Sequence, residues 1–229
     1  MVRALLAGRK TQTRRIVSKR LPAGARYTGI HYASDERDSW FFNSPSGPGK
    51  VPVRYEQGDR LYVRESVRFW AEGDDCEITF VDDRRRQTGP CTGDIPDASL
   101  AAYFRLIDRS YNDGERRSIG IPSIHMPRWA SRLTLIVEEV RVEPLQEISV
   151  RDAIAEGLNY APGGWWSGSD GQSAPDPVAA YALLWNSLHT ENEQRWQDNP
   201  HVVALTFRVE RANIDQVATQ DAVRDRVAS

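Results

Sequence analysis

The sequence predicts an α+β protein, in which a mixed, mainly antiparallel β-barrel or pseudobarrel carries a few covering helices. Strand-like and helix-like segments are interspersed, without the regular alternation that a doubly wound parallel sheet requires. The chain has 229 residues, 40% of them hydrophobic, which is enough to bury a core without disulfides or metals. It contains no apolar run of 18 residues, so we expect no membrane partner and a cytoplasmic protein.

The first half of the chain is expected to supply one helix and three strands. Residues 1–6 favour a short helix, which Gly8 ends. Residues 11–17 have the β-branched, alternating character of a strand. Residues 60–64 alternate polar and apolar side chains after a Gly-Asp turn, and residues 76–81 also favour a strand.

The chain from residue 97 onward is expected to contain three helices and two strands. Residues 97–107 have helical spacing, whereas the β-branched run 133–142 is the strongest strand of the chain. Residues 149–155 favour a helix capped by a serine. Residues 176–188 begin with an Asp-Pro pair, which suits a helix N-terminus, and residues 201–209 form a final strand.

We expect one domain over residues 1–210, interrupted by insertions at about 21–57 and 159–177, and a polar tail over 211–229. Gly, Pro, Ser and Asn dominate the first insertion, which reads as a surface excursion. The second reads as a Gly/Ser/Pro/Trp loop. Both are expected to form walls or lids of a cleft.

Charge and motif content exclude several function classes. The net charge is −2, yet residues 1–34 carry eight basic side chains and no acidic one. This end of the chain is either a solvated stretch or a local anion site, because a nucleic-acid-coating protein is usually basic overall. The four histidines and two cysteines lack metal-ligand spacing, so we expect no metal and no cofactor. The motifs of serine hydrolases and P-loop nucleotidases do not occur.

The most informative segment runs Gly-Arg-Lys-Thr-Gln-Thr-Arg-Arg from Gly8 to Arg15. It resembles the Gly-x-Lys-x-x-Thr-x-Arg motif of the ASCH family, with Lys10 and Thr13 at motif positions. Further segments are similar to those of larger, phage-type members: residues 58–65, 123–132, 156–157 and 196–203. In this last segment His201 stands where an aromatic residue is common.

The resemblance implies a PUA-like pseudobarrel whose members handle nucleosides and RNA. Some small members hydrolyse the amide of N4-acetylcytidine with a Lys, a Thr and a downstream Glu. Lys10 and Thr13 match by motif and Glu156 matches by position. The remaining expected site residues are substrate-binding: Arg15, Arg14, Gly8, Trp129, His125 and Glu65.

These residue types suit amide hydrolysis, which needs a base, a nucleophile, an acid and an oxyanion partner. Burial among arginines disfavours the charged form of Lys10, so Lys10 can accept a proton from Thr13 or from water. Glu156 can then protonate the leaving nitrogen, while Arg15 holds the oxyanion.

The leading hypothesis is a metal-independent amidohydrolase that acts on N4-acylated cytosine nucleosides. The first alternative is an RNA-binding or modified-base-reading module, which would stack bases on loop aromatics such as Trp165 and Trp166. The second is an ASCH-type ribonuclease, in which Lys10 and the arginines stabilise a phosphate. The sequence leaves the oligomeric state and the preferred acyl group open.

Overall fold

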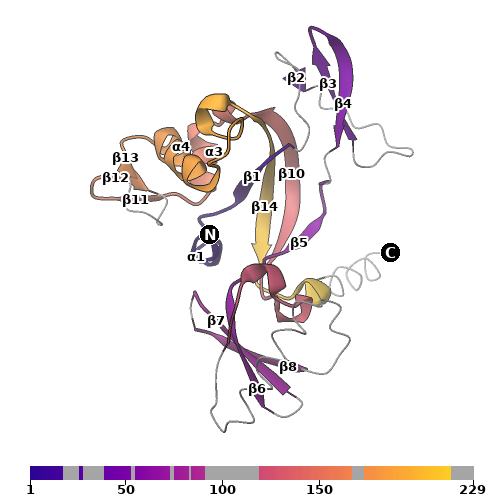
Figure 1. Ribbon diagram of the computed structural model, residues 1–229, viewed down its shortest axis with the longest axis vertical. Coiled ribbons are helices and arrows are strands. Elements are labelled where there is room, and N and C mark those ends of the chain that lie inside the picture. The colour runs from indigo at the N-terminus through magenta and orange to yellow at the C-terminus, as the bar shows by residue number, and fades with distance from the viewer. Residues whose placement is uncertain are drawn as a thin grey trace, which may run out of the picture. The chain divides into compact units, whose positions relative to one another are not determined.

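A computed structural model describes the protein at residues 1–17, 26–27, 39–52, 55–72, 75–82, 84–90, 119–166 and 173–217 (Figure 1). Contacts divide the chain into two compact units. Unit 1 comprises Arg3–Asp59 and Ile136–Val209, and unit 2 comprises Arg60–Leu135 and Glu210–Ser229. The expected single domain over residues 1–210 stays a prediction. The fold is α+β, with mostly antiparallel pairings between its strands.

Unit 1 is built on curved strands that lie side by side in the order β1, β14, β10 (Figure 1). These strands span Gln12–Ile16, His201–Glu210 and Thr134–Pro144. The predicted strands at 11–17, 133–142 and 201–209 are therefore confirmed within a few residues. The register of β1 against β14 pairs Arg14 with Ala204.

The helices of unit 1 begin or end at the residues expected from the sequence. The first helix, α1 (Val2–Leu6), ends in a turn at Gly8, whose φ of +69° favours glycine. In α3 (Val150–Ala155) the Ser149 hydroxyl accepts from the Asp152 amide at 3.1 Å. Asp176 caps α4 (Pro177–Leu188) by accepting from two backbone amides. Short 3₁₀ turns occur at Leu145–Glu147 and Trp196–Asp198.

Both insertions contain strands, so their interpretation as loops was incomplete. The first holds the antiparallel strands β2 (Arg26–Tyr27), β3 (Ser39–Ser44) and β4 (Gly47–Pro52). The second holds β11 (Asn159–Ala161), β12 (Gly164–Trp166) and β13 (Ser173–Ala174). Composition misled because the same glycines that favour loops also form tight hairpin turns. Gly163, in the turn, and Gly164, the first residue of β12, have φ of +109° and +121°.

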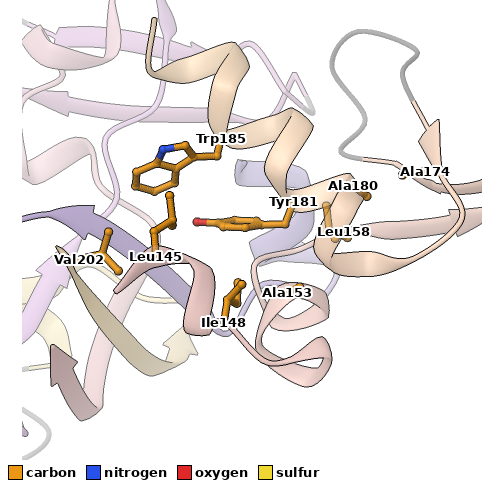
Figure 2. Close-up of a cluster of buried hydrophobic side chains, with 9 residues drawn as sticks. All are labelled: Leu145, Ile148, Ala153, Leu158, Ala174, Ala180, Tyr181, Trp185 and Val202. Atoms are coloured by element: carbon orange, nitrogen blue, oxygen red, sulfur yellow. The ribbon is translucent and has the colours of Figure 1, made fainter. Parts of the chain in front are cut away.

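A hydrophobic cluster packs α4 against α3 and the strands of unit 1 (Figure 2). Tyr181 and Trp185 project from α4 toward Leu145, and both are buried. Trp165 of β12 packs against the same cluster. The cluster therefore fixes α4 and the β11–β12–β13 sheet next to the segment that carries Glu156.

Unit 2 contains a second antiparallel sheet in the order β8-β7-β6-β9. Its strands span Arg86–Pro90, Asp75–Phe80, Val67–Glu72 and Ile119–Ile121, and β5 (Arg60–Tyr62) belongs to the same unit. Val67 pairs with Phe80 and with Ile121, and all three are buried. Two 3₁₀ turns follow at Ser123–His125 and Arg128–Ala130.

The beginning of the C-terminal tail buries apolar side chains, although the composition of the tail is polar. Ile214 and Val217 are buried, and the Asn213 amide donates to backbone oxygens of Arg128 and Ser131. The beginning of the expected polar tail is thus packed. The expected helix at 97–107 lies outside the described residues.

Candidate active site

The motif segment places alternate side chains on opposite sides of the chain. Lys10, Gln12 and Arg14 are buried, whereas Arg15 is exposed and Thr13 is half-buried. This alternation is what an extended strand imposes, because successive side chains point to opposite faces. The buried side of a strand that reads Lys-x-Gln-x-Arg is wholly polar, so its groups require partners.

Lys10 and Glu156 form the centre of the site. The Lys10 Nζ donates to Glu156 Oε2 at 2.6 Å and to the Glu156 carbonyl oxygen at 2.9 Å. The two residues also pair as an isolated antiparallel bridge. Their side chains are only 9% and 4% exposed, so little water screens the ion pair. The structure therefore brings together two of the three residues that the resemblance assigns to catalysis.

The Arg14 guanidinium is surrounded by hydrogen-bond acceptors. Its Nη1 donates to Gln12 Oε1 at 2.8 Å and to Glu156 Oε1 at 3.1 Å. Its Nη2 donates to Glu143 Oε1 at 2.8 Å and approaches Asp152 Oδ2 at 3.4 Å. The Arg14 side chain has no exposed surface. Arg14, expected to bind substrate, instead holds carboxylates of the protein.

Asp152 links this centre to the surface. Its carboxylate accepts from Gln12 Nε2 at 3.0 Å and from Arg141 Nη2 at 3.0 Å. Burial by itself would raise the pKa of Asp152, but the hydrogen bonds from Arg141 and Gln12 and the arginine charges outweigh it and hold that pKa below its usual value. Asp152 is thus an ionised anchor for both arginines.

Tyr181 closes the site from the side of α4. Its hydroxyl donates to Glu156 Oε1 at 3.5 Å, which is a weak hydrogen bond. Burial, and then the charge of Glu156, raise the pKa of Tyr181. The phenol therefore stays neutral and remains a donor. Sequence reasoning missed Tyr181 because its spacing indicates only the core face of a helix.

Gly157 fixes the distance between the two chain segments. Its φ is +98°, and a Cβ atom at this position would lie 3.0 Å from the Cβ atoms of Ala4 and Lys10. Only glycine allows this approach without displacement. The sequence selected residues 156–157 only as part of a resemblance, so the close approach of Gly157 to Lys10 is a new observation.

Thr13 and Arg15 lie on the other side of β1 from Lys10 and Arg14 by strand alternation. The Thr13 hydroxyl has no hydrogen-bond partner within the part of the chain that the structure describes. The mechanism that passes the Thr13 proton to Lys10 therefore lacks the contact it needs. Gly8 is exposed and serves as the turn after α1, which is a conformational role.

Three expected substrate-binding residues belong to unit 2. Glu65 is buried, and its carboxylate accepts from Arg132 Nε at 2.9 Å and from Arg132 Nη2 at 2.6 Å. The Arg132 guanidinium also stacks 3.8 Å from the centre of the Phe80 ring. Both carboxylate oxygens of Glu65 thus accept hydrogen bonds from Arg132. His125 and Trp129 are half-buried in the two 3₁₀ turns, and their expected role stays a prediction.

The loop tryptophans differ in their surroundings. Trp165 packs on the core cluster, with its ring centre 5.2 Å from that of Tyr160. The Trp166 indole nitrogen is buried without a hydrogen-bond partner among the described residues. Tyr160 is 68% exposed, so it is the open aromatic ring of this hairpin. The expected stacking of bases on Trp165 and Trp166 stays a prediction.

Across the described residues, no group of three His, Cys, Asp or Glu side chains is arranged to hold a metal ion. None of the helices in these ranges is both long enough and apolar enough to cross a lipid bilayer. Comparisons with protein-family models, curated proteins and solved structures found no match to this chain.

Proposed function

We propose that this protein is a metal-independent amidohydrolase of PUA-like fold that removes the acyl group from N4-acylated cytosine nucleosides. The observation that carries the proposal is the buried Lys10–Glu156 pair, formed by the motif lysine and a glutamate 146 residues away. A buried ion pair is a costly way to stabilise a fold, because the charges lose their hydration. The presence of such a pair at the motif lysine supports a chemical role.

The pair can supply both proton transfers of the reaction. In the proposed reaction one proton first passes from the Lys10 ammonium to the Glu156 carboxylate across their contact of 2.6 Å, which leaves an amine beside a carboxylic acid. Lys10 then takes a proton from water, and the hydroxide attacks the acyl carbonyl. Glu156 gives its proton to the N4 nitrogen as the C–N bond breaks. The products are a carboxylic acid and a cytosine nucleoside, and the ion pair is restored.

Water is a better nucleophile for this scheme than Thr13. Thr13 lies on the opposite side of β1 from Lys10, and its hydroxyl would have to cross the strand to reach the amine. We therefore assign base and acid to Lys10 and Glu156 and leave Thr13 outside the proton transfers. Arg15 lies on the same side of β1 as Thr13, so it too is left outside this scheme, and its expected role as the partner of the oxyanion stays a prediction.

The charges of the site favour an uncharged substrate over a phosphate. Lys10, Arg14 and Arg141 each contact carboxylates of the protein: Glu156, Glu143 and Asp152. A ribonuclease needs cations that can turn to a pentacovalent phosphate. Cations already matched by protein carboxylates suit that reaction poorly, so the hydrolase is preferred to the ribonuclease.

The test is hydrolysis of N4-acetylcytidine by purified protein with EDTA present, followed by chromatography for cytidine. We expect cytidine from the parent and at least a 100-fold lower kcat from Lys10→Met and from Glu156→Gln, which is the usual scale of acid–base catalysis of about 10²–10⁴-fold. Circular dichroism checks that each variant is folded. No cytidine from the parent over a panel of N4-acyl cytosines would reject the proposal in favour of RNA binding or cleavage.

A further inference from the structure

The two oxygens of the Glu156 carboxylate have different partners. Oε2 faces the ammonium of Lys10, whereas Oε1 accepts from Arg14 Nη1 and from the Tyr181 hydroxyl. The terminal torsion of a glutamate is normally broad, so a free carboxylate would rotate over a wide range. The contacts to one oxygen therefore fix the plane in which the other oxygen meets Lys10.

Arg14 is itself held from three elements. Gln12 of β1 accepts from Nη1, Glu143 of β10 accepts from Nη2, and Asp152 of α3 lies 3.4 Å from Nη2. A guanidinium has a rigid, planar set of donors, which can satisfy several acceptors in one plane. A lysine at this position would offer the same charge from a single point. The two terminal nitrogens of Arg14 therefore match their surroundings in shape as well as in charge, whereas its buried Nε has no hydrogen-bond partner among the described residues.

We infer that Arg14 is a positioning residue: it clamps Oε1 of Glu156 so that Oε2 stays directed at Lys10, without contacting the substrate. This inference rests on the proposed function for its catalytic meaning. The residue was expected to bind substrate, but its buried guanidinium is engaged by groups of the protein. A positioning residue of this kind lowers kcat when it is replaced and leaves KM nearly unchanged.

Unit 2 contains a matched control. Arg132 is a second buried arginine that binds a buried carboxylate through two hydrogen bonds, to Glu65. Arg14→Lys and Arg132→Lys therefore remove the same kind of interaction from the same kind of environment. Both variants are expected to lower stability. Only Arg14→Lys disturbs the Lys10–Glu156 contact.

The kinetic test compares kcat and KM of the parent, Arg14→Lys and Arg132→Lys on N4-acetylcytidine, at a temperature where circular dichroism shows all three folded. We expect kcat of Arg14→Lys to fall roughly 10–100-fold, the scale of an ångström of misplacement, with KM within about threefold. Arg132→Lys should keep kcat within about twofold. Equal losses in both variants, or an unchanged kcat in Arg14→Lys, would overturn the inference.

A second measurement separates this inference from the proposed function, because it needs no substrate. Urea denaturation of Lys10→Met, Glu156→Gln and the double variant gives the coupling between the pair. The same cycle is then repeated with Arg14→Lys present. We expect the coupling to shrink by at least half in that background. A coupling that is unchanged shows that Glu156 is positioned without Arg14, whatever the protein hydrolyses.

Discussion

Gly157 shows how one missing side chain sets the geometry of the site. An alanine there would meet Ala4 and Lys10 at 3.0 Å and would have to keep a φ of +98°. We predict that Gly157→Ala lowers the free energy of unfolding by about 1–3 kcal/mol and reduces hydrolysis more than stability alone explains, since Lys10 is displaced. Urea denaturation and kcat measure the two effects.

The control for Gly157 is Gly120, which has no atom within 4 Å of an added Cβ and no positive φ. Gly120→Ala should leave the free energy of unfolding within about 0.5 kcal/mol of the parent, as is usual for surface substitutions. If the two alanine variants unfold alike, the close approach at Gly157 has no energetic importance.

The ionised carboxylate of Asp152 makes the free energy of unfolding decrease as the pH becomes acidic. Its pKa in the folded protein lies below the ordinary value of 3.8, so the folded state favours the carboxylate. The stabilisation is complete above about pH 4 and is lost as pH falls below 3.8 through the folded pKa. We predict that Asp152→Asn unfolds at lower urea than the parent at neutral pH, and that this difference shrinks below pH 4.

Asp215 supplies the comparison for Asp152. Its pKa is also lowered, first by a hydrogen bond from Arg128, but both side chains are more than half exposed. Salt screens such a surface pair strongly. The effect of Asp215→Asn should therefore be small and vanish in 1 M salt, whereas that of Asp152→Asn should persist. A salt-sensitive Asp152 effect would contradict the burial of the network.

The residues of the site could be predicted from the sequence only in part. The motif predicted Lys10, and the position along the chain predicted Glu156. The structure places these two side chains in contact. Strand alternation from Lys10 would also have selected Gln12 and Arg14 in place of Thr13 and Arg15. Glu143 and Tyr181 carry no local signal, because their contact with the motif depends on tertiary packing.

At the scale of elements, the cap of α4 governs the helix that carries Tyr181 and Trp185. Asp176 Oδ1 accepts from the amides of Val178 at 2.9 Å and Ala179 at 3.1 Å. Replacing such a cap with alanine costs about 1 kcal/mol. We predict that loss for Asp176→Ala in urea denaturation. Ser187→Ala, which removes an exposed hydroxyl from the last turn of the same helix, should cost less than half as much.

The elements that were predicted best are those with a local cause. Asp176 and Ser149 predict the starts of the two helices because their side chains cap backbone amides within three residues. The long strands β10 and β14 are evident from β-branched runs. The β11–β12–β13 sheet was missed because its strands are short and its order depends on Trp165 packing on the core.

At the scale of the whole molecule, basic side chains that are neighbours in the sequence pair with carboxylates from distant parts of the chain. The basic N-terminal segment was interpreted as either a solvated stretch or a local anion site, yet Lys10 and Arg14 are buried against carboxylates that lie more than 120 residues away. Within residues 1–17 only Arg3, Arg9 and Arg15 present an exposed basic side chain. The local positive charge is therefore partly cancelled in the fold, which linear charge counting does not reveal.

The position of β14 between β1 and β10 has a consequence for the nascent chain on the ribosome. Glu156 follows the motif lysine by 146 residues, which takes roughly 7–30 s at ordinary synthesis rates. The strand that joins the sheet together emerges later still. A prematurely terminated chain would therefore display the motif as solvated cations without its carboxylates, and only complete translation through residue 210 assembles the site.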